Sequence, residues 1–326
     1  PPSAGFTRIL VNKGSITNNG VELALNFNPI STDDIELSFG GNISFNKTEI
    51  LNLDSQPLQG FYENGIMTDR RFYYGNTISR GAIFRYPANV FVEGEESSLF
   101  YGFKTNGIYQ TNDTDMISGA VPGDVRIVDQ LTEDLDGDGI LDSGDGVIDE
   151  KDRTFLGNPN PDFVYGFNFN LKYKRWNLSA LFNGVYGNDI ANGMLLQLDN
   201  AEGRPNANIL TGAYNNAWRV DTPSNTHPRI GYTTRGQIAI TDRIIEDGSY
   251  LRLNNLTIGY DIPVGEKNFI DNLNVYIAGQ NLFTWTSYSG YDPEVSTFLY
   301  TGLITGVDWN GGVNARNILL GVNFKF

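Results

Sequence analysis

The stretch Ile318-Leu-Leu-Gly-Val-Asn-Phe-Lys-Phe326 closes the sequence and decides how the rest of it is interpreted. Apolar side chains occupy every second position, whereas polar or small ones, with Leu319 as the exception, fall between them. Because successive side chains of a strand point to opposite faces, this pattern predicts a strand with one apolar and one polar face. Taken alone, the stretch fits both the last strand of a membrane barrel and an edge strand of a soluble sandwich.

The same alternation recurs along the chain. It predicts further strands at 21–28, 35–46, 163–173, 175–183, 250–262 and 273–285. We expect a turn that contains Pro29 between the first two and a tight turn at Lys174-Arg175 between the next pair. The phase slips at Asn254-Asn255, and since a one-residue slip reverses every later side chain, a β-bulge is predicted there. Tyr86–Glu93 and Leu99–Phe103 are apolar enough for additional strands.

The linkers between these strands differ greatly in length. Some are tight turns, whereas Lys47–Pro87 and Gly187–Arg243 exceed ordinary loops. Strands of about 9–11 residues, short turns at one end and long loops at the other are typical of outer-membrane barrels. Tyrosine and tryptophan near the strand ends fit an interfacial aromatic girdle. The sequence therefore favours an all-β protein, an antiparallel transmembrane β-barrel.

Composition excludes several functional classes. The chain has 326 residues, a formal net charge of −15 and no cysteine. The acidic balance argues against nucleic-acid binding, and the lack of cysteine excludes disulfides, thiol catalysis and cysteine-ligated zinc. No run approaches the roughly 20 apolar residues that a spanning helix needs. The only histidine, His227, has no obvious catalytic partner, so we predict that the chain is not an enzyme.

An acidic loop carries the strongest local motif. From Asp134, oxygen-bearing side chains stand at positions 1, 3, 5, 9 and 12 with glycine at position 6, which is the spacing of a calcium loop. We predict that it lies in a cation-binding segment, 121–152, inserted within the barrel. The predicted ligand residues are Asp134, Asp136, Asp138, Ile140 through its carbonyl, Asp142, Asp145, Asp149 and Asp152.

Two departures weaken this motif. Position 12 is Asp145 rather than the longer glutamate, and the second register, which contributes Asp149 and Asp152, lacks carboxylates at its first and third positions. No helical pattern flanks the loop, so a sensor that opens a groove is not expected. The interpretation is a structural Ca²⁺ or Mg²⁺ that pins an extracellular loop; a solvated Asp/Gly turn is the alternative.

Several short motifs, in their order along the chain, resemble the SusC/RagA-type TonB-dependent outer-membrane transporters. They are Asn12-Lys-Gly through Asn19-Gly-Val-Glu22, Phe100-Tyr-Gly-Phe-Lys104, Gly107-Ile-Tyr109, Pro122-Gly-Asp124, Asp152-Arg-Thr154, Gly157-Asn-Pro159, Pro161-Asp-Phe163, Tyr250-Leu-Arg-Leu253, Gly259-Tyr260, Gly279-Gln-Asn-Leu282 and Gly290-Tyr-Asp-Pro293. The terminal aromatic pair, Phe324 and Phe326, also resembles the assembly signal of bacterial outer-membrane barrels.

The resemblance implies a plugged barrel of about 22 strands, of which 1–326 would be the C-terminal part. It implies import of oligosaccharides or peptides, with a SusD-like lipoprotein as a lid. It also implies contact with the TonB complex through a plug missing here, with the barrel-assembly machinery, and with outer-membrane lipid and lipopolysaccharide. Ile318–Phe326 would then pair with a first strand that this chain lacks. No residue is assigned to the glycan or peptide ligand.

Two other functions stay open on the sequence alone. One is a secreted, calcium-stabilised β-sandwich that binds carbohydrate through tyrosine and tryptophan. The other is a glycoside hydrolase that uses paired carboxylates. Within the first long linker, Arg70–Tyr74 could stack on a sugar or pack against a neighbouring loop. Of the two, packing is the favoured interpretation.

Overall fold

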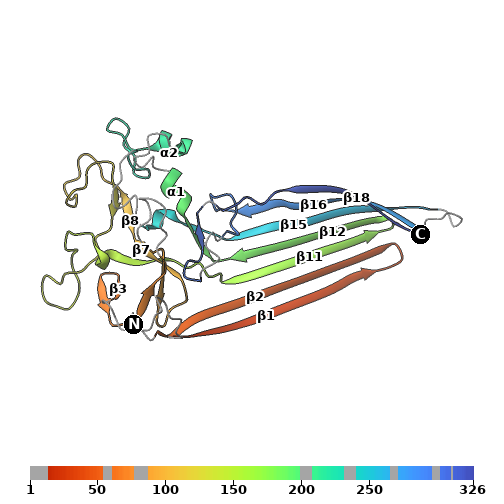
Figure 1. The fold of residues 1–326 in the computed structure, drawn as a ribbon, viewed down its shortest axis with the longest axis horizontal. Coiled ribbons are helices and arrows are strands. Elements are labelled where there is room, and N and C mark those ends of the chain that lie inside the picture. Colours follow the sequence, from red (N-terminus) through yellow and green to blue (C-terminus); the bar gives the residue numbers. More distant parts are fainter. Residues whose placement is uncertain are drawn as a thin grey trace, which may run out of the picture.

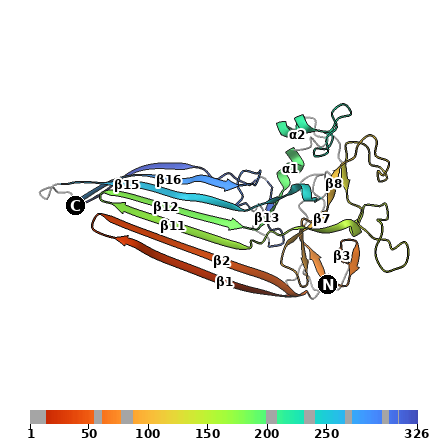
Figure 2. The ribbon, with the colours of Figure 1, turned by 180° about the vertical axis from the view of Figure 1, so that it is seen from behind.

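Seven long strands lie side by side in one antiparallel sheet, and the remaining elements gather at one end of it (Figure 1). This computed structural model describes residues 14–53, 61–76, 87–198, 208–230, 240–264, 271–295, 302–309 and 311–326. The view from behind shows the same division into a sheet and a cluster of loops (Figure 2). We call these two parts the sheet and the loop cluster.

The sheet follows the order β1-β2-β11-β12-β15-β16-β18. Its strands are β1 (Gly14–Ser31), β2 (Ile35–Leu53), β11 (Phe163–Tyr173), β12 (Trp176–Tyr186), β15 (Tyr250–Ile262), β16 (Asn272–Thr286) and β18 (Asn317–Lys325). All seven strands predicted from the alternation are confirmed. Within the described residues, β1 and β18 each pair with a single neighbour, so the sheet is an open portion of a barrel.

Two hairpin turns were predicted from the sequence, and the structure shows where each of them lies. Lys174-Arg175 joins β11 to β12 with no break in register, as predicted, and Lys174 has a φ of 54°. The prediction for the first hairpin was wrong in position. Pro29 lies inside β1 at a register shift between Phe27 and Ile30, and the turn falls at 32–34. Proline donates no ladder hydrogen bond, which is why it is tolerated at such an irregularity.

The first two strands are also longer than predicted. β1 has 18 residues and β2 has 19, compared with the expected 9–11. Backbone pairing continues from the alternating segment through polar residues as far as Gly14 and Leu53. Alternation of apolar and polar side chains identifies only the part of a strand that has one apolar face. The backbone hydrogen bonds of β1 and β2 extend beyond that part, so the two strands are longer than the alternation predicted.

The bulge predicted near Asn254 is confirmed. In the pairing of β15 with β16, the register shifts between Leu253 and Asn255. In the pairing of β15 with β12, it shifts between Leu181 and Phe182 of β12. Asn281, on the facing part of β16, has a φ of 52°. The irregularity lets Leu253 and Leu256 occupy the same face although three positions separate them.

The loop cluster consists of short elements. They are β3 (Phe61–Glu63), β4 (Ile66–Thr68), β5 (Phe72–Tyr74), β6 (Asn89–Val92), β7 (Leu99–Phe103), β8 (Thr105–Ile108), β9 (Val125–Ile127), the 3₁₀ helix η2 (Glu150–Asp152), β10 (Arg153–Gly157), β13 (Asp189–Asn192), α1 (Gly193–Leu198), α2 (Thr211–Asn216), the 3₁₀ helix η3 (Asp242–Ile244), β14 (Ile245–Asp247) and β17 (Val307–Asp308). Both additional strands anticipated from the sequence, β6 and β7, are present here.

Buried apolar side chains concentrate in the loop cluster rather than in the sheet. Its largest core cluster joins residues from β7, β13, α1 and β17 with those of neighbouring loops: Ala88, Phe100, Ala191, Leu196, Ile240, Ile244, Ile304, Val307 and Trp309. A second cluster packs Phe61, Val90, Val92, Leu99 and Tyr101. The long linkers therefore build a packed body of their own.

One face of the sheet is apolar and bare. Leu25 is 71% exposed, and Leu320 is 82% exposed. In the described part of the chain no second sheet covers this face, as a β-sandwich would require. Among those residues no helix is long and apolar enough to span a bilayer. The fold is a portion of an antiparallel transmembrane β-barrel, and the sandwich interpretation is not supported.

Candidate functional site

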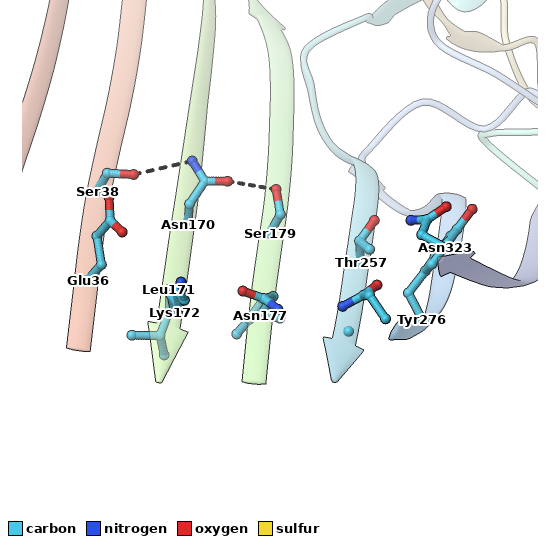
Figure 3. Close-up of a pocket in the computed structure, with 13 residues that line it drawn as sticks. Glu36, Ser38, Asn170, Leu171, Lys172, Asn177, Ser179, Thr257, Tyr276 and Asn323 are labelled. Atoms are coloured by element: carbon cyan, nitrogen blue, oxygen red, sulfur yellow. Dashed lines mark hydrogen bonds between the residues drawn. The ribbon is translucent and has the colours of Figure 1, made fainter. Parts of the chain in front are cut away.

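The opposite face of the sheet, which we call the polar face, is lined by amides and hydroxyls. Near the short turns, Asn170 on β11 donates to Ser38 Oγ on β2 at 3.4 Å and accepts from Ser179 Oγ on β12 at 2.8 Å (Figure 3). Three strands are thus joined by side chains as well as by backbone. A strand presents alternate residues to this face, so the periodicity that makes one face apolar makes the other one polar.

A cavity of about 490 Å³ lies on the polar face around these residues. The cavity extends across β12, β15 and β16 to β18 (Figure 3). The polar residues that line it on these four strands are Asn177, Thr257, Asn274, Tyr276 and Asn323. Asn177 and Asn274 both donate to the carboxylate of Asp261, at 3.1 and 2.8 Å.

Charge on this cavity is low and balanced. Lys172 and Glu36 are cross-strand partners of opposite sign, and the other polar lining side chains are neutral amides and hydroxyls. Such a surface can form hydrogen bonds with an uncharged polar solute or a polypeptide backbone.

A buried ion pair joins the polar face to a loop. Arg252 of β15 is 3% exposed and donates to Asp292, to Glu294 at 2.7 Å and to Thr284 Oγ1 at 3.1 Å. Asn314 also donates to Asp292, which is 6% exposed. Buried charges are tolerated only when paired and hydrogen-bonded, and here each charge has such partners.

The sequence did not predict this network, although its two ends belong to separate motifs, Tyr250–Leu253 and Gly290–Pro293. The sequence did contain one indication that Arg252 has a buried partner. Arg252 is the only charged residue between Tyr250 and Tyr260, and it occupies a polar-face position of an alternating strand. A charge in such a place needs a partner, but the sequence does not say which carboxylate 40 residues away provides it.

A second buried arginine ties the loop cluster together. Arg153 is 2% exposed, lies over the rings of Tyr101 and Tyr74 at 4.5 and 4.9 Å, and pairs with Glu150 at 2.9 Å. Burial raises the pKa of Tyr74 to about 12 and that of Tyr101 further still. Both phenols therefore stay protonated at physiological pH, and the Arg153–Glu150 pair supplies the charges beside them.

The first three aspartates of the acidic loop come together. One carboxylate oxygen from each of Asp134, Asp136 and Asp138 lies within 4.8 Å of the others, and all three side chains are exposed. Asp134 accepts the backbone N–H groups of Gly139 and Gly137 at 2.9 and 2.7 Å, and these hydrogen bonds lower its pKa. The loop thus holds a compact group of carboxylate oxygens, the donor type that Ca²⁺ and Mg²⁺ prefer.

The other predicted ligands of this loop have protein partners of their own. Asp142 accepts from Leu135 N at 3.0 Å, and the backbone N–H of Ile140 donates to Asp138. Asp145 pairs with Lys151 at 2.8 Å, and this contact lowers the pKa of Asp145.

The last two predicted ligands lie at η2. Asp149 caps this helix by accepting from Lys151 N. Asp152 is buried, which raises its pKa to about 6, and it accepts from Gln130 N and Asp149 N, each at 2.7 Å. The structure therefore brings three of the predicted ligands together and places these two in local turn structure.

Two further sequence candidates have clear positions. Phe324 and Phe326 stack at the end of β18 with ring centroids 5.9 Å apart, on the apolar face. Among Arg70–Tyr74, the guanidinium of Arg70 contacts Glu95 at 2.6 Å and Glu63 at 3.3 Å, and Phe72 packs against Phe61. This segment packs within the loop cluster, as favoured.

His227 pairs with Ala217 through a backbone bridge in the loop cluster. Its ring Nδ1 lies 3.0 Å from the hydroxyl of Thr226.

The chain is similar in sequence to several TonB-dependent receptors. No protein-family model matches the chain. TonB-dependent receptor P3 of Formosa agariphila is 30% identical over 333 residues, which cover 100% of this chain and 30% of that protein. TonB-dependent receptor SusC of Bacteroides thetaiotaomicron is 27% identical over 335 residues, which cover 97% of this chain and 27% of SusC.

Solved structures agree in fold. The structure of the RagAB peptide transporter aligns with a TM-score of 0.71 at 21% identity, covering 100% of this chain and 31% of that one. The chain spans about 30% of the length of the curated relatives it matches. It is thus a homologue of the TonB-dependent receptors, SusC among them, and corresponds to a portion of their β-barrel.

Proposed function

We propose that this chain supplies barrel wall and extracellular loops to a TonB-dependent receptor that imports a nutrient across the bacterial outer membrane. The observation that carries the proposal is a sheet with a bare apolar face and a polar face, matched along its whole length by receptors of this type. A chain with that division of surface suits a wall between lipid and an aqueous passage. The relatives are named receptors and transporters, which supports a role other than catalysis.

Labelling of single cysteines in the full receptor tests the orientation of the wall. The chain contains no cysteine of its own, so a label reports one position. Ser179→Cys lies on the polar face and Leu320→Cys on the apolar face. In intact outer membranes, a water-soluble maleimide should label the first and reach the second only after solubilisation. Equal labelling of both positions in intact membranes would contradict the proposal.

The transported solute is proposed to be an oligosaccharide or a peptide. The lining of the 490 Å³ cavity consists mainly of amides and hydroxyls with one charge of each sign, which supports such a solute over a highly charged one. Uptake of a labelled oligosaccharide mixture and a labelled peptide mixture, by cells with and without the receptor, separates the two classes. Uptake should depend on the proton-motive force. A rate unchanged by its collapse would exclude TonB-dependent import.

The proposed partners follow from the same arrangement. The loop cluster, at the end of the sheet away from the short turns, suits a SusD-like lipoprotein lid on the extracellular side. TonB would act through a plug region outside this chain. The Phe324–Phe326 pair would be the contact for the barrel-assembly machinery during insertion. Co-purification of a lipoprotein with the receptor from outer membranes, lost when 121–152 is deleted, would support the first of these.

We further propose that 121–152 is a structural cation-binding segment within the barrel chain. The convergence of Asp134, Asp136 and Asp138 supports a Ca²⁺ or Mg²⁺ ion there, because three carboxylates repel one another unless a cation offsets their charge. The ion would stiffen the loop and would take no part in chemistry. Calcium titration followed by isothermal calorimetry, with Asp136→Asn as the weakened variant, tests this assignment.

A further inference from the structure

A small three-stranded sheet joins two long linkers where the seven-stranded sheet meets the loop cluster (Figure 2). β13 lies in the linker between β12 and β15 and pairs antiparallel with β14, whereas β17 lies in the linker between β16 and β18 and pairs parallel with β13. The β13–β17 ladder consists of two residue pairs, Ala191 with Val307 and Asn192 with Asp308. Because so short a pairing is marginal by itself, side chains must help to hold the two linkers together.

One face of this small sheet carries oxygen-bearing side chains from all three strands. Asn192 and Asp308 are partners in the ladder, and Glu246 of β14 pairs with Ile190, two residues before Asn192. Since alternate residues of a strand share a face, as do paired residues, the three polar side chains lie on the same side. Ser289, in the loop that follows β16, contacts this side: its hydroxyl and its backbone N–H each donate to Glu246 at 2.8 Å.

The amide of Asn192 leaves one buried acceptor without a donor. Its nitrogen donates to Glu246 at 2.9 Å and to Ser289 Oγ at 3.2 Å, whereas Oδ1 has no hydrogen-bond partner although Asn192 is only 2% exposed. Exchange of the two amide atoms would set an oxygen against the Glu246 carboxylate, so the orientation is fixed. Because both atoms are bonded to one carbon, Oδ1 lies beside the same group of oxygens. A buried carbonyl oxygen in that position needs a donor or a cation.

The neighbouring carboxylates lack a counter-charge within the described residues. Asp308 is 3% exposed and accepts from the Tyr288 hydroxyl at 2.7 Å and from Gly311 N at 2.9 Å. These donors are neutral, as are the amide and serine donors of Glu246. The buried charge of Arg252, by contrast, has carboxylate partners. Two carboxylates and an unpartnered amide oxygen therefore share one face without a cation to balance them.

We propose that this face binds one Ca²⁺ ion through Asn192 Oδ1, the carboxylates of Asp308 and Glu246, and the hydroxyl oxygen of Ser289, with water in the remaining positions. Carboxylate, amide and other neutral oxygens are hard donors that calcium accepts in flexible numbers. Its two positive charges match the two carboxylates, and the ion supplies the partner that the Asn192 oxygen lacks. The four residues lie outside 121–152, so this site is separate from the acidic loop.

The ion would tie together two linkers that lie far apart in the sequence. Asn192 and Glu246 belong to the linker before β15, and Asp308 and Ser289 to the linker before β18. Trp309, next to Asp308, packs in the largest core cluster, so the second linker is also anchored in the loop cluster. Without the ion the two carboxylates would repel each other, which weakens the short β13–β17 pairing. The site is therefore a structural clamp between two loops.

Calcium binding to the full receptor, purified in detergent and stripped with EDTA, tests the site. All variants carry Asp136→Asn, which weakens the acidic loop, and titration calorimetry measures the binding that remains. Asp308→Asn keeps an acceptor for Tyr288 but removes a charge. It should weaken calcium affinity by about tenfold or more, because the number of charged ligands tunes affinity in such sites. Asp189→Asn, on the opposite face of β13, is the matched control and should leave the affinity unchanged.

Proteolysis locates the effect within the chain. With calcium present, the segment around β17 should be protected, and EDTA should increase cleavage there. Asp308→Asn should show the faster cleavage even with calcium, whereas the Asp189→Asn control should keep the protection. Asn192→Asp retains a ligand oxygen and adds a charge, so it should bind calcium more tightly and lose more protection when EDTA is added.

Equal calcium affinity with and without Asp308→Asn would overturn the assignment, as would cleavage around β17 that EDTA does not change. Either result would give the Asn192 oxygen a buried water molecule as its partner instead. Heat-modifiable migration on a gel reports the folding of each variant separately. If Asp308→Asn does not fold, Asn192→Asp decides, and an unchanged calcium affinity of that variant would refute the site.

Discussion

At the scale of single residues, the molecule depends on a few buried charges with assigned partners. Arg252 connects a barrel strand to the loop that carries Asp292, and Arg153 connects two tyrosines with Glu150. In each case a guanidinium is preferred because its planar set of donors reaches several acceptors at once. Sequence patterns identified these positions as charged, but their partners became visible only in three dimensions.

Removing the guanidinium of Arg252 should be costly. Arg252→Met leaves the carboxylate of Asp292 buried without a cation, and loss of one partner of a buried pair costs about 3–5 kcal/mol. Urea unfolding of the receptor in lipid vesicles measures this. Arg252→Met combined with Asp292→Asn should recover much of the loss. Arg126→Gln, which breaks a more exposed pair with Asp113 and Asp115, should cost no more than about 1 kcal/mol. Equal effects of the two single arginine variants would contradict the assignment.

Asp189 should make the loop cluster pH-sensitive. Burial, with the nearby carboxylates of Asp247 and Asp162, raises its pKa above the ordinary 3.8, so the folded state holds its proton more tightly than the unfolded state. The stability that this group contributes is therefore present below pH 3.8 and is lost as pH rises through the raised pKa. Protease digestion of the loop cluster should accelerate from pH 4 toward neutrality, as followed with a protease active across that range. Asp189→Asn should show a smaller acceleration; an unchanged profile would exclude this residue.

At the scale of elements, side-chain alternation predicts strands well where one face meets lipid and the other meets a polar interior. Each of the seven predicted strands is present, and the bulge near Asn254 lies where the phase slips. Alternation did not predict where β1 and β2 end, because their backbone pairing continues beyond the alternating residues. It also could not phase β6 and β7, because both of their faces are buried.

The acidic loop permits a test at this scale. If a cation offsets the charges of Asp134, Asp136 and Asp138, EDTA should increase proteolysis within Val121–Asp152 and leave cleavage of the sheet unchanged. Asp136→Asn should already show the faster cleavage without EDTA. Digestion mapped by mass spectrometry distinguishes the two regions. Identical digestion with and without EDTA would count against a bound cation.

At the scale of the whole molecule, the distribution of apolar residues is the reverse of that in a water-soluble protein. The sheet exposes residues such as Leu320, whereas the loop cluster has the buried core. The sheet, with its exposed apolar face, is suited to lipid, whereas the loop cluster, with its buried core, is suited to water. The polar face of the sheet then lies toward the interior of the barrel.

This distribution makes the isolated 326-residue chain dependent on detergent. Without it, the apolar face and the single-neighbour strands β1 and β18 would associate with other copies, because unpaired edges and bare apolar surface both drive aggregation. Light scattering of the refolded chain in buffer, with and without detergent above its micellar concentration, measures this. A monodisperse, folded chain in plain buffer would contradict the membrane interpretation.

The sequence by itself determined the seven strands of the sheet, their phase and the class of fold, because alternation is a local property that a strand displays in the order of its residues. It also located the acidic loop, since its spacing is local. Only the tertiary structure decided which distant charges pair, as Arg252 does with Asp292, and which predicted ligands converge. It alone placed Asn192 beside Asp308. These outcomes depend on register between strands far apart in the chain, and register is a property of the assembled sheet.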